Sequence, residues 1–197
     1  MQQYLESTEY IDWKNTEVLA RAESLAEGLT DLEAIARRCF VYVRDEIQHS
    51  WDFERDPVTC KASDVLEHGT GYCYAKSHLL AALLRANGIP AGLCYQRLTI
   101  SDDGDGPPFC LHGLNALYLE EHGWYRIDAR GNKPGVAADF CPPTERLAFP
   151  IVSEGEADLP EIWAEPIGPV LNVLSTQTTY KAVADNLPDI QVVTANQ

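Results

Sequence analysis

One long apolar helix constrains the fold of this chain more than any other feature of the sequence. Residues 73–87 carry four closely spaced leucines, and Gly88 follows where glycine commonly ends a helix. The apolar faces of this segment are broad, so we expect it to be the central, buried helix. Its first residue is Cys73, which Gly69 and Gly71 precede.

Shorter helices are expected before the central helix, and strands after it. Apolar periodicity and a capping box at residues 30–33 support this order. The expected elements are helices over residues 16–27, 30–47 and 63–68, then strands over about residues 92–100, 112–119 and 124–129. A turn at His122 and Gly123 joins the last two strands into a hairpin. This order predicts an α+β fold, with the cysteine-bearing helix packed on an antiparallel sheet.

The chain beyond Asn132 shows weaker patterns. It is Pro-rich and irregular to about Gly168, and its last residues are expected to fray. Helical segments are expected over residues 170–174 and 179–187. The length suits one domain over residues 1–197, with a core at about 30–132 and a C-terminal extension at 133–197.

The charge of the chain argues against two classes of partner. A formal net charge of −15 does not suit nucleic acid, because phosphate binding needs concentrated Lys and Arg, and it does not suit an anionic membrane surface. The first residues lack a secretory signal pattern, and the six cysteines include no C-x-x-C pair. We therefore expect reduced thiols and a cytoplasmic location.

Three residues form a candidate nucleophilic site. Cys73 stands at a helix start, where unpaired N–H groups and the helix dipole favour a thiolate, and its own N–H can donate to an oxyanion. His112 at the start of a strand is the candidate base, and Asp128 on the next strand is the candidate group that orients it. Each residue alone also has a structural interpretation, as a buried small thiol, a strand-end histidine and a turn carboxylate.

The hairpin geometry supports part of this grouping. His112 and Asp128 are both even-numbered, so alternation points both side chains to one face of the sheet. A turn centred on His122 would pair Asp128 with Ala116, about 13 Å along the strand from His112. We expect a bulge, with Gly123 as the candidate position, or strong coiling to close that gap.

Three motifs resemble those of the transglutaminase-like superfamily. GYC at residues 71–73 and LLRANGIPA at residues 83–91 look like its G-x-C…LLRAxGIPAR signature. HGLNALYL at residues 112–119 and GWYRID at residues 123–128 are similar to its H-x-W-x-E-V-Y-L…G-W-x-x-x-D segment. Together the three motifs cover roughly residues 33–132 in the family's order.

The resemblance implies a papain-like fold in which Cys73, His112 and Asp128 are nucleophile, base and orienting acid. It implies acyl chemistry on a peptide or small amide substrate, as a transglutaminase or cysteine protease, with no cofactor and no metal. The chain departs from the family pattern at Leu114, at residues 115–116 and at residues 129–130. The departures remove no catalytic group, but they leave the substrate, the choice between hydrolysis and transfer, and the oligomeric state open.

Other interpretations remain. The same triad serves arylamine acetyltransferases, which use acetyl-CoA, although the acidic chain lacks a basic phosphate cradle. A non-catalytic binding module of the same fold is a second alternative, and a structural scaffold is the weakest. Three aspartates in the loop at residues 101–108 favour a cationic amine acceptor over coenzyme A.

Several further polar residues have a weaker functional interpretation. Gln48 or Trp51 is a candidate oxyanion-supporting group, against the interpretation of both as ordinary surface or core residues. His78 is expected to be structural. A zinc site built from Cys73, Cys94 and Cys110 is disfavoured, because no paired spacing of zinc ligands is present.

Overall fold

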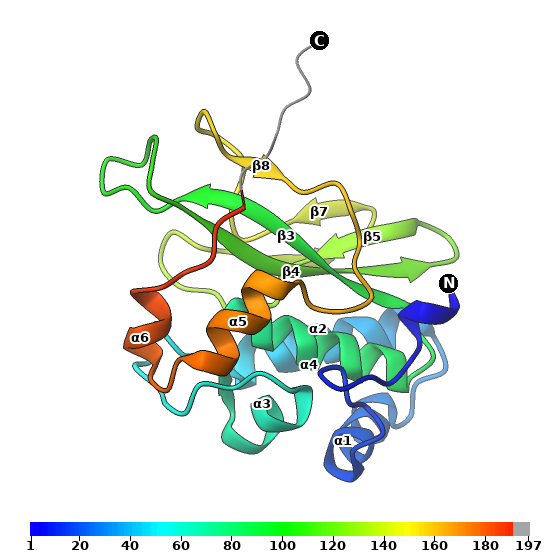
Figure 1. Cartoon of the computed structure of the whole chain (residues 1–197). Helices are drawn as coiled ribbons and strands as arrows, with labels where there is room; N and C mark the ends of the chain where they lie inside the picture. The colour runs from blue at the N-terminus through cyan, green and yellow to red at the C-terminus, as the bar shows by residue number, and fades with distance from the viewer. Residues whose placement is uncertain (191–197) are drawn as a thin grey trace.

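The computed structural model describes residues 1–190 and contains helices on one side of an antiparallel sheet (Figure 1). The helices are α1 (Thr16–Ala26), α2 (Leu32–Glu46), α3 (Ala62–His68), α4 (Cys73–Ala86), α5 (Gly168–Thr176) and α6 (Tyr180–Ala184), after a 3-10 turn, η1, at Gln2–Tyr4. The strands are β1 (Gln48–His49), β2 (Thr70–Gly71), β3 (Ala91–Thr99), β4 (Phe109–Leu119), β5 (Gly123–Ile127), β6 (Asp139–Cys141), β7 (Thr144–Arg146) and β8 (Ala157–Asp158). The α+β class predicted from the sequence is therefore confirmed.

Helix α4 is the buried centre of the fold. Every residue from Cys73 to Arg85 is buried, and the helix contacts α1, α2 and α3 as well as β3 and β4. Arg85 shows how a charge is accommodated there, because its guanidinium donates to the backbone carbonyls of Glu6, Ala91 and Ala164. The expectation of a central helix bearing Cys73 is met.

The main sheet has the strand order β5-β4-β3-β8, and all of its neighbours are antiparallel. One face packs on the helices through side chains such as Leu93, Leu111 and Leu117. The other face carries a smaller apolar cluster of Cys94, Leu114 and Ala116, against which Leu147 and Ile162 pack. The segment after Asn132 therefore covers the second face of the sheet.

The structure corrects several details of the sequence prediction. Asp31, and not a capping box at residues 30–33, caps α2, because its carboxylate accepts from the backbone N–H of Ala34 at 2.9 Å. The segment predicted to be irregular contains the short strands β6, β7 and β8. Helices α5 and α6 are present near their predicted positions. The prediction of frayed final residues concerns residues 191–197, which lie outside the described part of the chain.

The hairpin between β4 and β5 has a different register from the predicted one. Leu119 pairs with Gly123 and Asn115 with Ile127, with uninterrupted pairing between them. The same register continued by one residue places Asp128 opposite Leu114, only two residues from His112. The axial offset is thus roughly 7 Å instead of 13 Å. The predicted bulge is wrong, because the pairing is continuous and a three-residue turn centred on Glu121 already shortens the offset.

No helix within residues 1–190 is both long enough and apolar enough to cross a lipid bilayer.

Candidate active site

A close approach between α4 and β4 brings Cys73 to the sheet. A Cβ at Gly113 would lie only 2.9 Å from the ring and 3.0 Å from the Cα of Tyr74, so glycine allows the strand to reach the helix start. The Tyr74 hydroxyl donates to the carbonyl of Leu111 on the same strand. As a result, the Cys73 Sγ accepts from the backbone N–H of Gly113 at 3.4 Å.

The residue before Gly113 is His112, which forms a histidine–carboxylate pair with Asp128. His112 Nε2 lies 2.7 Å from Asp128 Oδ2, and both side chains are buried. Asp128 also accepts from the backbone N–H groups of Arg130 and Ala148, each at 3.1 Å. The imidazole is held edge-to-face against Phe149, with ring centroids 5.0 Å apart. Because Nε2 is used by Asp128, Nδ1 is the nitrogen left for Cys73.

The electrostatics of the pair favour an ionised histidine. Burial lowers the pKa of His112, but the charges of Asp128 and Cys73 and hydrogen bonds to both raise it to about 10. Burial raises the pKa of Asp128, but His112 and the two backbone donors outweigh burial and hold this pKa below its ordinary value. An imidazolium beside Cys73 in turn stabilises a thiolate.

The surroundings of Cys73 differ from those of the other buried thiols. Burial raises the pKa of Cys39, Cys60, Cys94 and Cys110 to about 12. These four thiols are therefore protonated and unreactive at neutral pH. Cys141 is partly exposed, and its Sγ lies 3.3 Å from the carbonyl of Thr144.

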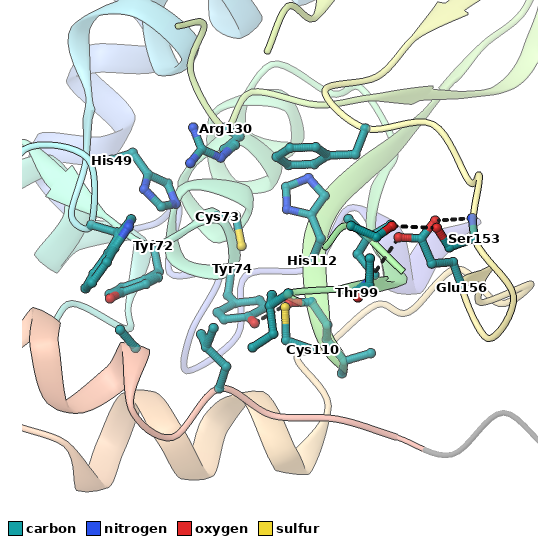
Figure 2. Close-up of a pocket in the computed structure, with 18 of the residues that line it drawn as sticks. His49, Tyr72, Cys73, Tyr74, Thr99, Cys110, His112, Arg130, Ser153 and Glu156 are labelled. Carbon is teal, nitrogen blue, oxygen red and sulfur yellow. Dashed lines mark hydrogen bonds between the residues drawn. The ribbon is translucent and has the colours of Figure 1, made fainter. Parts of the chain in front are cut away.

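Cys73 and His112 open into a cavity of about 850 Å³. Figure 2 shows the Cys73 sulfur and the His112 ring facing its interior. Its walls are mostly apolar and aromatic, and Asp102 of the loop between β3 and β4 contributes to the lining. Asp185 and Leu187 line it from the C-terminal side. The cavity is large enough for a peptide side chain or a small amide.

The structure places the other sequence candidates outside the reacting centre. The side-chain Oε1 of Gln48 accepts from Arg55 Nη1 at 2.7 Å, so this side chain is already engaged elsewhere. Trp51 lines the cavity, but its side chain is half exposed. His78 is fully buried, and its Nδ1 lies 2.7 Å from the carbonyl of Cys60, as expected for a structural histidine. Within residues 1–190 there is no cluster of three or more potential metal ligands.

The two glycines before Cys73 shape the end of α3 and the start of α4. Gly69 ends α3 with a φ of 63°. A Cβ at Gly71 would meet Ala75 and the Thr59 hydroxyl at 3.2 Å each, so Gly71 permits close packing under the start of α4.

Sequence reasoning missed three contributors to the site. Ala148 and Phe149 come from the extension and hold Asp128 and His112 in place. His49 lines the cavity from β1. Ala148 acts through its backbone, and Phe149 lies in an irregular segment, so neither carries a periodic signal. His49 directly follows Gln48, and Gln48 was the candidate oxyanion-supporting residue predicted from the sequence.

The comparison with protein families decides the relationship. The transglutaminase-like superfamily matches residues 20–129, which is more than half of the chain. This chain belongs to the transglutaminase-like superfamily. No curated protein sequence matches it.

Two solved structures are similar to this chain at low sequence identity, and the first of them shows the same fold. A candidate cysteine protease from Cytophaga hutchinsonii is 18% identical with a TM-score of 0.52, over 64% of this chain and 40% of the other. The periplasmic domain of TgpA from Pseudomonas aeruginosa is 21% identical with a TM-score of 0.47, over 64% of this chain and 45% of the other. This transglutaminase-like chain thus spans less than half the length of either protein.

Proposed function

We propose that this transglutaminase-like protein catalyses thiol-dependent acyl transfer or amide hydrolysis through an acyl-enzyme on Cys73. The observation that carries the proposal is the buried 2.7 Å contact between His112 and Asp128 on the strand that also donates to the Cys73 sulfur. Nucleophile, base and orienting carboxylate are the three groups that such a reaction needs.

In the proposed reaction, Cys73, His112 and Asp128 act both when the acyl-enzyme forms and when it breaks down. The Cys73 thiolate attacks the carbonyl carbon of the donor, a C–S bond forms, and the carbonyl π electrons move to the oxygen. When the tetrahedral intermediate collapses, the C–N bond breaks and the departing nitrogen takes a proton from the His112 imidazolium. The neutral imidazole then accepts a proton from water or an amine, which attacks the thioester and regenerates the thiolate. Asp128 keeps the ring oriented throughout.

The lining of the cavity favours amide donors over an acyl-CoA donor. Asp102 and Asp185 contribute carboxylates to the lining. Arg130 also lines the cavity, but its guanidinium is paired with Asp52. Such a surface repels the phosphates of coenzyme A and attracts ammonium groups. We therefore propose a peptide or small amide donor, with water or a cationic amine as acceptor.

Intact-mass spectrometry distinguishes these possibilities. The protein is incubated with acyl-donor peptides plus a labelled amine, and separately with acetyl-CoA. We expect a mass increase that maps to Cys73 and amide turnover in the first reaction only. Cys73→Ala is the matched control and removes the adduct. Acetylation of Cys73 by acetyl-CoA without amide turnover supports the acetyltransferase alternative. No adduct from any donor supports the binding module.

A further inference from the structure

A second buried histidine borders the cavity, across from His112. His49 ends β1, and the parallel pairing of β1 with β2 places it beside Gly71, two residues before Cys73. Its side chain is only 6% exposed and packs edge-to-face on Tyr72, with ring centroids 5.4 Å apart. Figure 2 shows His49 and His112 on opposite sides of the Cys73 sulfur, with the edge of the His49 ring turned toward it.

One nitrogen of this ring has no hydrogen-bond partner. His49 Nδ1 is buried and unpaired within the described residues. Asp52 Oδ2 lies 3.6 Å from Nδ1, which is too far for a hydrogen bond. Asp52 is already engaged by Arg130 at 2.6 and 3.1 Å and by Lys133 at 2.6 Å. No hydrogen bond within the described residues holds the ring proton on Nδ1, so Nε2 can carry it as His49 lines the cavity.

The groups around His49 keep the ring neutral. Burial lowers the pKa of His49 well below its ordinary value, and the charge of Arg130 lowers it further. Lys76 and His112 act in the same direction, and only Asp52 opposes them. A neutral ring with its proton on Nε2 is a hydrogen-bond donor that needs no ionisation.

Other side chains near the sulfur are less suited to donate. Both Nη groups of Arg130 are held by Asp52. The indole of Trp51 is 47% exposed and therefore solvated. The backbone N–H groups at the start of α4 have no intrahelical acceptor, and Tyr72 provides no side-chain cap, so the Cys73 N–H remains available as one donor.

We propose that His49 is a catalytic residue of this cleft, whose Nε2–H donates to the carbonyl oxygen of the acyl donor as that oxygen gains negative charge. The inference rests on the acyl chemistry proposed above. The carbonyl π electrons that move to oxygen when the C–S bond forms are stabilised by His49 Nε2–H on one side and the Cys73 backbone N–H on the other. When the intermediate collapses, the electrons return and His49 keeps its proton.

The test compares two reactions of the same sulfur. Acylation by p-nitrophenyl acetate develops an oxyanion, whereas alkylation by iodoacetamide displaces iodide and develops none. We expect His49→Phe to slow acylation of Cys73 by about 100-fold, the loss typical of one oxyanion donor, while alkylation changes less than about threefold. His49→Gln retains an N–H and should recover most of the acylation rate. His68→Phe changes an exposed histidine that does not line the cavity, so it is the matched control and should leave both rates unchanged.

The outcomes separate this inference from the proposed function. Acylation of the wild-type protein with an unchanged rate in His49→Phe overturns only the role of His49. Equal losses of acylation and alkylation also overturn it, because they indicate a structural role. Failure of every donor to acylate the wild-type protein overturns the proposed function itself. If His49→Phe does not fold, a peptide aldehyde added to the wild-type protein replaces it. The thiohemiacetal should move the ¹⁵N resonance of His49 Nε2, and an unmoved resonance overturns the role.

Discussion

Two histidine–aspartate pairs border Cys73, and the pKa of the histidine is shifted in opposite directions in the two pairs. The pKa of His112 is raised to about 10 beside Asp128, whereas the pKa of His49 is lowered well below its ordinary value beside Asp52. Both rings are buried, so burial alone does not separate them. The distance between the histidine nitrogen and the carboxylate oxygen separates the two pairs, since it is 2.7 Å in the first pair and 3.6 Å in the second.

The other partners of each carboxylate explain the rest of the difference. Asp128 accepts from neutral backbone N–H groups, so its charge acts fully on His112. Asp52 faces the cationic groups of Arg130 and Lys133, so its charge is largely cancelled before it reaches His49. Arg130 takes part in both pairs, through its backbone in one and its guanidinium in the other. A carboxylate near a histidine therefore predicts an imidazolium only when nothing else neutralises it.

The largest expected effect comes from removing Cys73 or the histidine of the first pair. Cys73→Ala should abolish acyl transfer, and His112→Ala should lower it by about 10⁶-fold, because nucleophile and base act as one unit in the proposed reaction. The measurement is acylation followed by intact mass, with circular dichroism to show that the fold is retained. Cys141→Ser is a matched control that removes a partly exposed thiol and should leave the rate unchanged. A His112→Ala variant with near wild-type turnover would contradict the assignment.

Removing the carboxylate of the first pair should have a smaller effect. Asp128→Asn leaves His112 without the charge that raises its pKa, so acyl transfer should fall by about 10⁴-fold. In the proposed reaction Asp128 orients the base and does not attack, which is why the loss is smaller than for Cys73→Ala.

The titration of His112 checks the cause of that loss. In the wild-type protein the imidazolium persists until the pH approaches about 10, so the His112 ring should show no NMR titration between pH 7 and about 9. In Asp128→Asn the charge of Asp128 is absent, so His112 should lose its proton at lower pH. Identical His112 titrations in the two proteins would show that Asp128 does not set the charge of His112.

A third prediction tests the second pair. Lys133→Met removes one of the cations that neutralise Asp52, so the pKa of His49 should rise toward its ordinary value. Histidine NMR titration measures this change directly. Arg55→Met is a suitable control, because Arg55 pairs with Gln48 and not with Asp52. An unchanged His49 titration in Lys133→Met would mean that Lys133 does not neutralise the effect of Asp52 on His49.

The sequence predicted the part of the fold whose signals are local. The helix beginning at Cys73, the left-handed end at Gly88 and the hairpin around Gly123 depend on apolar spacing and glycine, and all three are present. The strand register was harder to predict. Moving the centre of the turn by one residue shifts the residue that lies opposite Asp128 by two positions along β4. The short strand β8 pairs with β3, although more than 50 residues separate them in the sequence. No local sequence pattern predicts such a contact.

The candidate site shows the same difference between local sequence signals and tertiary contacts. Cys73, His112 and Asp128 were identified because each lies at a recognisable point of a helix or strand. The groups that set their electrostatics come from outside those motifs, as with the backbone N–H of Ala148 and the ring of Phe149. His49 depends on the pairing of two short strands, β1 and β2. Supporting contacts of this kind are made by the tertiary fold and are invisible in a linear motif.

The smallest expected effect concerns the acidic loop that contributes to the lining of the cavity. Asp102 lines the cavity, and Asp103 and Asp105 follow it in the same exposed loop. If these carboxylates attract the acceptor, the rate with a diamine should be about two- to fivefold higher at low ionic strength, because salt screens such fields over about 8–10 Å. Hydroxylamine, which is neutral at pH 8, should show no such dependence. Replacing the three aspartates by asparagine should remove the salt effect for the diamine and leave hydroxylamine unchanged. A salt effect that survives this replacement would assign the attraction to the net charge of −15 of the whole chain instead of to the loop.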